Sequence, residues 1–381
     1  MKIGFFMDDY FPSMNGVIYV MDNYAKLLGK SCEVVVIVPE IDKNYKDKFP
    51  YRVIRTSSIK MKKVGYSFST PWFDRGLTKK LIQENFDIIH IHSPFIMGRL
   101  GIHIAKKCNI PVVGTIHTRF NYEFERLIKS KMINKWLMEF VINTYNRCDE
   151  CYTVNEAIKK IYIDYGIKPR ISIIPNATEL KPVKDKEKAI NYINDTYNIN
   201  KDDKVLLFVG RINIVKNILL LTESLKEVKK SNIPFKMLFV GPLEDGDKLN
   251  NKIKECNLGD SVKVIGKITD RELLSYFYVR ADLFLFPSVF DTSSLVQVEA
   301  TSQKTPTVFI ASSPTASNVI DNVNGFISKE GTKNYGKKIV SILQDDKLYK
   351  EVSEKAFNDI YITWDKAVKI LLSKYKEIEK N

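Results

Sequence analysis

Short apolar runs alternate with longer amphipathic stretches along almost the whole chain. One series of runs lies at 3–8, 33–39, 87–92, 111–117 and 171–175, and a second lies at 204–211, 235–241, 261–266, 282–288 and 306–310. Apolar runs without polar alternation predict strands buried on both faces, and intervening stretches such as 17–30 and 218–230 predict amphipathic helices. This β-α-β rhythm indicates parallel sheets covered by helices.

The two series of strands predict an α/β fold with two doubly wound, Rossmann-like domains that face each other across a cleft. We expect the boundary near 178–179, where Pro175, Asn176 and Pro182 interrupt a strongly charged stretch. Ligands of open α/β sheets bind beyond the carboxyl ends of the strands. Side chains with a chemical role are therefore expected directly after the predicted strands.

Charge and cysteine content limit the classes of binding partner and the cellular compartment that we expect. The formal net charge is +14, and residues 51–150 hold 17 Lys and Arg against 8 Asp and Glu. A basic surface favours nucleic acid, a phosphate-bearing ligand or an anionic membrane, although solvated lysines without a partner explain the excess equally well. Five scattered cysteines, an N-terminus unlike a signal peptide and the lack of any apolar run of about 18 residues predict a cytoplasmic protein.

The first strand is followed by DDYFPSMNG, residues 8–16. Neither GxGxxG nor GxxxxGK[ST] occurs there, and their absence argues against a dinucleotide-binding site or a P-loop NTPase site. Gly16 nevertheless stands at the entry to a helix, where a missing side chain lets an anion approach the helix N-terminus. A plain turn glycine is the alternative.

Two cations follow the first strand of the second series in FVGRINIVKN. Arg211 lies at the carboxyl end of the strand, and Lys216 lies just before the next helix. A guanidinium fork and an ammonium beside a helix N-terminus suit a diphosphate, and they can neutralise it without a metal. The alternative is two surface cations at a sheet edge.

A third candidate stretch is FDTSSLVQVEA, residues 290–300, just past the strand DLFLFPS. Ser293 or Ser294 is a good N-cap, which leaves the first backbone N–H groups of the following helix free to face an anion. Glu299 then lies on the face of Leu295 and can accept hydrogen bonds from ribose hydroxyls, while Asp291 can meet a second sugar. The alternative is a loop aspartate and a glutamate that only complements the helix dipole.

Histidines and paired aspartates give weaker signals. His117 ends the strand PVVGTIH, where a histidine can contact a substrate. His90 and His92 share one strand face, but no third ligand has matching spacing, so we expect no metal site. Asp245 and Asp247 resemble a DxD metal motif, although a simple polar turn explains them.

Two segments combine basic and aromatic residues. They are 59–80, which includes Lys60, Lys62, Lys63, Tyr66 and Trp72, and 125–147, which includes Lys129, Lys131, Lys135, Trp136 and Phe140. Such segments suit the interface of an anionic bilayer. For 125–147 the pattern predicts one helix, and core packing with a solvated face is the alternative.

Taken together, these motifs resemble the GT-B-fold retaining glycosyltransferases of family 4, in particular the bacterial branch of diacylglycerol α-glucosyltransferases. The resemblance rests on DDYFPSMNG, DIIHIHSPFIMG, TIHTRFNYEFER, LFVGRINIVKN and ADLFLFPSVFDTSSLVQVEA, and it spans essentially the whole chain. It implies an acceptor-binding domain at 1–178, completed by a crossover helix at 363–381, and a nucleotide-sugar-binding domain at 179–362.

The resemblance also implies roles for single residues. Near the reacting sugar and its leaving group it places His117, Asp291, Arg211 and Lys216; around the donor nucleotide it places Gly16, Arg211, Lys216, Ser294, Leu295 and Glu299. Three positions depart from the commoner family pattern: Asp291 replaces a glutamate, Ser294 replaces a glycine, and Asn15-Gly16 replaces a pair of glycines. Each change is expected to affect donor choice.

The resulting hypothesis is a metal-independent, retaining hexosyltransferase. It would move a hexose from a nucleotide sugar, with UDP as the expected nucleotide, to a membrane-associated acceptor such as diacylglycerol or a glycolipid, at the inner face of the plasma membrane. The alternatives are a glycosyltransferase of capsular or cell-wall polysaccharide assembly and a basic nucleic-acid-binding protein.

Overall fold

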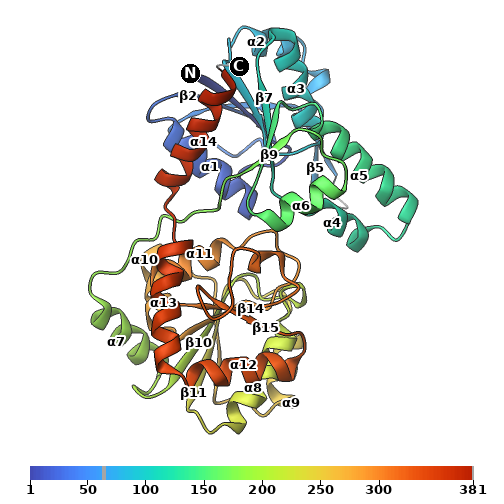
Figure 1. The fold of residues 1–381 in the computed structure, drawn as a ribbon. Helices are drawn as coiled ribbons and strands as arrows, with labels where there is room; N and C mark the ends of the chain where they lie inside the picture. The colour runs from blue at the N-terminus through green and yellow to red at the C-terminus, as the bar shows by residue number, and fades with distance from the viewer. Residues whose placement is uncertain (62–65, 380–381) are drawn as a thin grey trace. The chain divides into compact units, whose positions relative to one another are not determined.

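The structure is a computed structural model that describes residues 1–61 and 66–379. It divides into two compact units. Unit 1 comprises Met1–Asn176 together with the final segment from Trp364, and unit 2 comprises Ala177–Thr363. Both units are α/β, and Figure 1 labels many of their helices and strands.

Unit 1 is built on a seven-stranded parallel sheet with the order β3-β2-β1-β6-β7-β8-β9. The strands are β1 (Lys2–Phe6), β2 (Glu33–Pro39), β3 (Arg52–Thr56), β6 (Ile88–Ile91), β7 (Val112–Ile116), β8 (Glu150–Thr153) and β9 (Arg170–Ile173). A separate antiparallel hairpin joins β4 (Ser58–Met61) and β5 (Tyr66–Ser69). The central strands are buried on both faces, as the unbroken apolar runs predicted.

The helices of unit 1 connect and cover this sheet. They are α1 (Gly16–Leu28), α2 (Leu77–Ile82), α3 (Ile96–Cys108), α4 (Phe120–Leu127), α5 (Lys131–Tyr145), α6 (Glu156–Asp164) and α14 (Trp364–Glu379), with a 3₁₀ turn at Pro71–Phe73. The last helix, α14, lies beside α1, where the Trp364 ring lies 5.8 Å from that of Tyr24 (Figure 1). The chain thus returns to its first unit at its end.

Unit 2 has a six-stranded parallel sheet with the order β12-β11-β10-β13-β14-β15. Its strands are β10 (Lys204–Val209), β11 (Phe235–Val240), β12 (Val262–Gly266), β13 (Leu283–Leu285), β14 (Thr307–Ile310) and β15 (Phe326–Ser328). Its helices are α7 (Lys186–Tyr197), α8 (Ile218–Lys230), α9 (Gly246–Glu255), α10 (Arg271–Arg280), α11 (Leu295–Ser302), α12 (Thr332–Leu343) and α13 (Asp346–Ile360), with 3₁₀ turns at Ile214–Lys216 and Pro314–Ala316.

The single helix predicted over 125–147 is wrong. The chain forms α4 and α5 there, with a break at Ile128–Ser130. Ile128 has an extended backbone, and Asn134 donates from Nδ2 to its carbonyl at 3.0 Å. Ser130 then caps α5 by accepting from Ile133 N. Local side-chain hydrogen bonds compete successfully with a continuous helix at this point.

Candidate active site

In each of the two parallel sheets the strand order reverses once, and three of the candidate residues follow the two strands at the reversal in unit 2. In unit 1 the reversal lies between β1 and β6, and in unit 2 it lies between β10 and β13. Ligands of doubly wound folds bind at the carboxyl ends of the strands beside such a reversal. Arg211 and Lys216 follow β10, and Asp291 follows β13.

The loop after β10 is held in a fixed shape by the loop after β11. Asn213 donates from Nδ2 to Glu244 Oε2 at 2.6 Å, and the Ile214 amide donates to Asp245 Oδ2 at 3.0 Å. The backbones of Gly210 and Gly241 approach so closely that a Cβ on Gly241 would lie 1.9 Å from the Gly210 carbonyl oxygen. Asp245 therefore braces this loop, which agrees with a polar turn rather than a metal motif.

Lys216 and Asp291 form an ion pair that joins the two loops. The Lys216 ammonium donates to Asp291 Oδ1, and the two side chains are 14% and 24% exposed. Asn217 strengthens the connection because its Nδ2 donates to the Pro287 carbonyl at 3.0 Å. Asp291 Oδ2 is buried and accepts no hydrogen bond from the described residues. A cation and a carboxylate are thus in contact, and the second carboxylate oxygen can still accept a hydrogen bond.

Arg211 is more exposed than Lys216 and forms a longer ion pair. Its side chain is 63% exposed, and its Nη1 lies 3.8 Å from Glu244 Oε1. An ion pair at this distance and exposure contributes little to stability. The guanidinium can therefore exchange its partner for an anionic ligand at small cost.

Ser294 caps α11, as the sequence predicted. Its Oγ accepts from the Gln297 amide at 3.1 Å, and Leu295 is the first helical residue. The serine is buried, so it occupies room that a glycine would leave to a ligand. The first amides of α11 begin at Leu295, four positions after Asp291 in the chain, and a helix start suits an anion.

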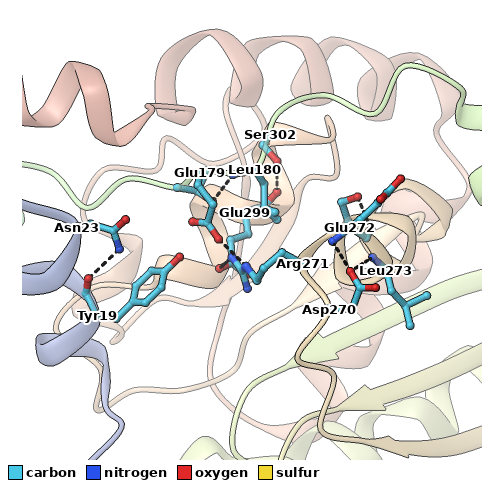
Figure 2. Close-up of polar contacts among 12 residues, drawn as sticks. Tyr19, Asn23, Glu179, Leu180, Asp270, Arg271, Glu272, Leu273, Glu299 and Ser302 are labelled. Carbon is cyan, nitrogen blue, oxygen red and sulfur yellow. Dashed lines mark hydrogen bonds and ion pairs between the residues drawn. The ribbon is translucent and has the colours of Figure 1, made fainter. Parts of the chain in front are cut away.

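Glu299 is buried in the second turn of α11, and both of its carboxylate oxygens accept hydrogen bonds. Arg271 donates from Nη2 to Oε1 at 2.6 Å, and Tyr278 donates from its hydroxyl to Oε2 at 2.8 Å. Burial raises the pKa of Tyr278 well above its usual value, so the phenol keeps its proton. Figure 2 shows Arg271 between Glu299 and Glu179. The sequence interpretation missed Arg271 and Tyr278.

In unit 1, Gly16 is the first residue of α1, and Asn15 is its cap. Asn15 Oδ1 accepts from the amides of Val17 and Ile18, both at 3.0 Å. Its Nδ2 donates to Asp9 Oδ2 at 3.0 Å, which anchors the loop after β1. Gly16 thus stands at a helix entry, although the cap oxygen already serves two of the free amides.

His117 belongs to a cluster of three histidines. Its Nε2 lies 3.1 Å from His92 Nδ1, and the two rings are nearly parallel. His90 is saturated, because Nδ1 bonds to the Tyr375 hydroxyl at 2.5 Å and Nε2 bonds to Thr115 Oγ1 at 2.6 Å. Burial lowers the pKa of His117 to about 3 and the pKa values of His90 and His92 well below the usual range, so the cluster is neutral at pH 7.

Across residues 1–61 and 66–379, no three His, Cys, Asp or Glu side chains are grouped so that they could hold a metal ion. His90 and His92, which share a strand face, use three of their four ring nitrogens within the protein.

Comparison with known proteins shows which family this chain resembles. The model of the "Glycosyltransferase Family 4" domain matches residues 14–181, and the model "Glycosyl transferases group 1" matches residues 191–359. Alpha-monoglucosyldiacylglycerol synthase of Acholeplasma laidlawii is 27% identical, with 93% of this chain and 92% of that protein covered. The synthase of the same name from Streptococcus pneumoniae is 28% identical, with 81% and 70% covered.

Solved structures give the same fold. Anabaena HepE in complex with UDP and glucose has a TM-score of 0.75 at 15% identity, with 98% of this chain and 99% of that chain covered. WaaG, a glycosyltransferase of lipopolysaccharide biosynthesis, has a TM-score of 0.69 at 14% identity, with 97% and 99% covered. These likenesses show that the two parallel α/β sheets of this chain have the arrangement of the GT-B fold. The chain belongs to the group 1, family 4 glycosyltransferases and uses a nucleotide-sugar donor.

Proposed function

We propose that the enzyme transfers a hexose from a UDP-sugar to a membrane lipid such as diacylglycerol or a glycolipid, with retention of the anomeric configuration. The observation that carries the proposal is the Lys216–Asp291 pair, in which a cation suited to a phosphate lies against a carboxylate suited to sugar hydroxyls. The names of the two synthases, which are similar over most of this chain, support diacylglycerol as the acceptor. The complex of HepE with UDP and glucose supports UDP as the nucleotide.

In this proposal unit 2 binds the donor. Arg211, Lys216 and the backbone at Ser294 and Leu295 meet the diphosphate, and Glu299 accepts from the ribose hydroxyls. Negative charge grows on the diphosphate as the bond to the sugar breaks, and fixed cations and amides stabilise charge that develops in the transition state. Asp291 accepts a hydrogen bond from a hydroxyl of the transferred sugar through Oδ2, which has no hydrogen-bond partner among the described residues.

Unit 1 contributes Gly16 and His117 in the same proposal. Gly16 admits the diphosphate, and neutral His117 contacts the transferred sugar. The acceptor hydroxyl attacks the anomeric carbon on the face from which the diphosphate leaves, so the carbon–phosphate oxygen bond breaks as the new glycosidic bond forms. The acceptor's proton passes to the departing phosphate oxygen. Configuration is retained without a covalent enzyme intermediate.

The surface of α4 and α5 supports a membrane-associated acceptor. Met132 is 79% exposed and Trp136 is 62% exposed, and Lys129, Lys131 and Lys135 lie in the same stretch. Exposed apolar side chains beside lysines suit the interface of an anionic bilayer. In the other basic segment, Trp72 and Phe73 are exposed, whereas Lys62 and Lys63 and the side chains of Lys60 and Tyr66 lie outside the described residues. None of the described helices is both long and apolar enough to cross a membrane.

A panel of UDP- and GDP-sugars tests the donor half of the proposal. Thermal stabilisation and slow hydrolysis of one UDP-hexose, both weakened in Arg211→Ala, would support it. A GDP-sugar as the preferred donor would contradict the assignment of UDP. Transfer to a lipid-linked oligosaccharide but not to diacylglycerol would favour polysaccharide assembly over glycolipid synthesis.

A further inference from the structure

Arg271 forms a bridge between two carboxylates in unit 2. It donates from Nη2 to Glu299 Oε1 at 2.6 Å and from Nε to Glu179 Oε1 at 2.5 Å (Figure 2). The Glu299 side chain is 7% exposed, whereas Arg271 and Glu179 are 37% and 38% exposed. The guanidinium therefore connects a buried carboxylate to one at the surface.

The burial of Glu299 requires such partners. An ionised carboxylate removed from water is costly unless it is paired and hydrogen-bonded. Arg271 supplies the opposite charge to one oxygen, and the fully buried Tyr278 supplies a neutral donor to the other. Two rigid contacts, one on each oxygen, fix the plane of the carboxylate.

The position of Arg271 is not explained by helix stability. Arg271 is the first residue of α10, and Asp270 caps this helix by accepting from the amides of Glu272 and Leu273. A cation at a helix N-terminus opposes the helix dipole. The arginine therefore lies where the helix itself would favour an acidic or neutral residue, and it contacts both Glu179 and Glu299.

The hydrogen bonds from Arg271 and Tyr278 occupy only part of the acceptor sites of the Glu299 carboxylate. A carboxylate offers about four lone-pair sites, and one on each oxygen is used by Arg271 and Tyr278. About one site per oxygen remains, which matches the two neighbouring hydroxyls of a ribose. We propose that Arg271 is a positioning residue that, with Tyr278, orients Glu299 so that its free lone pairs accept from both the 2′- and the 3′-hydroxyl of the donor nucleotide. This rests on the proposed function, in which Glu299 binds the ribose.

Calorimetric titration of the full-length protein with UDP, 2′-deoxy-UDP and 3′-deoxy-UDP tests this role. A hydrogen bond to a charged group is worth roughly tenfold or more in affinity, so the wild type should bind UDP at least about tenfold more tightly than either deoxy analogue. In Arg271→Gln the affinity for UDP should fall by about tenfold, and the preference over the deoxy analogues should fall to within about threefold.

Lys304→Gln is the matched control. Lys304 forms an ion pair with Glu354 in the same unit and is also 37% exposed, so this variant removes a cation of equal exposure from an ion pair. It should keep the wild-type preference for UDP. In turnover assays Arg271→Gln should raise the KM for the donor and leave kcat nearly unchanged, because ribose binding is the same in ground and transition states.

The outcomes separate the positioning role from the proposed function. A wild type that does not bind UDP would overturn both. A wild type that binds UDP without discriminating against the deoxy analogues, or an Arg271→Gln variant with the wild-type preference, would overturn only the role of Arg271. If Arg271→Gln does not fold, Tyr278→Phe takes its place. An unchanged preference in Tyr278→Phe would also contradict the proposal.

Discussion

The Lys216 ammonium donates a hydrogen bond to the Asp291 carboxylate, although the two residues are 75 positions apart in the chain. The pair joins the loop after β10 to the loop after β13, on the two strands where the sheet of unit 2 reverses its order. Both side chains are largely buried, so each is held in place before any ligand arrives. Preorganised charge of this kind is the main means by which enzymes stabilise a leaving diphosphate.

Removal of the Lys216 ammonium should damage turnover strongly. Loss of one preorganised donor to developing charge typically costs about 10²–10³-fold in kcat, and we expect that range for Lys216→Ala in UDP-hexose hydrolysis. Lys248→Ala is a suitable control, because Lys248 pairs with Asp245 in the same unit at the more exposed start of α9. Similar activity in both variants would contradict the role of Lys216.

The variant Arg211→Ala should lose activity but keep its stability. The arginine side chain is 63% exposed and its ion pair with Glu244 is long, so the melting temperature should change little. Turnover should nevertheless fall by about 10²-fold or more, because the guanidinium is expected to contact the diphosphate. Near-normal activity in this variant would remove Arg211 from the proposed site.

Much of the fold could be predicted because the central strands lie within unbroken apolar runs of the sequence. The run 33–39 coincides with β2, and the run 235–241 differs from β11 by one residue. β8 was missed because it is only ECYT, and the Glu150 carboxylate is satisfied within the sheet edge by Ser172 Oγ. β15 has three residues and depends on its neighbours in the sheet for burial.

The candidate site was predictable only in part. Ser294 and Gly16 could be placed at helix starts from local patterns, since capping depends on neighbouring residues. Arg271 could not be connected with Glu299, which lies 28 positions further along the chain. Their contact depends on how α10 and α11 pack on the sheet, and no local pattern specifies that.

The histidine cluster should make the protein sensitive to acid. His90 and His92 are buried with lowered pKa values, whereas the unfolded chain binds protons near its ordinary histidine pKa. Below about pH 6.5 the unfolded state therefore binds more protons, and the free energy of unfolding should fall as the pH decreases, by up to about 1.4 kcal/mol per pH unit for each such histidine. Urea unfolding at pH 7, 6 and 5 measures the slope.

The variant His90→Gln tests whether the histidine cluster causes this dependence of the unfolding free energy on pH. In His90→Gln one of the buried histidines is gone, so stability should be lower at pH 7 but should fall less steeply with acid. A wild-type slope in this variant, or a wild type with constant stability between pH 7 and pH 5, would show that the cluster is not neutral in the folded state.

Membrane binding should depend on the surface of α5. Lys131→Glu combined with Lys135→Glu should weaken co-sedimentation with anionic vesicles by at least about tenfold, since each lysine near an anionic surface is worth about 1 kcal/mol. Trp136→Ala should weaken it further. Tyr192→Ala removes an exposed aromatic side chain from unit 2 and should have no effect. Vesicle binding that is equal in all variants would contradict this surface.

Ser294→Gly should restore the glycine that is commoner at this position in the family. Loss of the hydroxyl cap costs only a few tenths of a kcal/mol when glycine replaces serine, so stability should hold. The additional room at the start of α11 should lower the KM for the donor or broaden the choice of donor sugar. Identical kinetics for the whole sugar panel would show that Ser294 does not limit the approach of the donor.

The most direct test of the proposed reaction is the anomeric configuration of its product. Purified enzyme is incubated with UDP-glucose and anionic vesicles that contain diacylglycerol, and the extracted lipid is analysed by proton NMR. We expect an α-linked hexosyl-diacylglycerol with the small anomeric coupling of that linkage, and no such product with Arg211→Ala. A β-linked product, or transfer to a glycan acceptor alone while diacylglycerol is left unchanged, would contradict the proposed reaction.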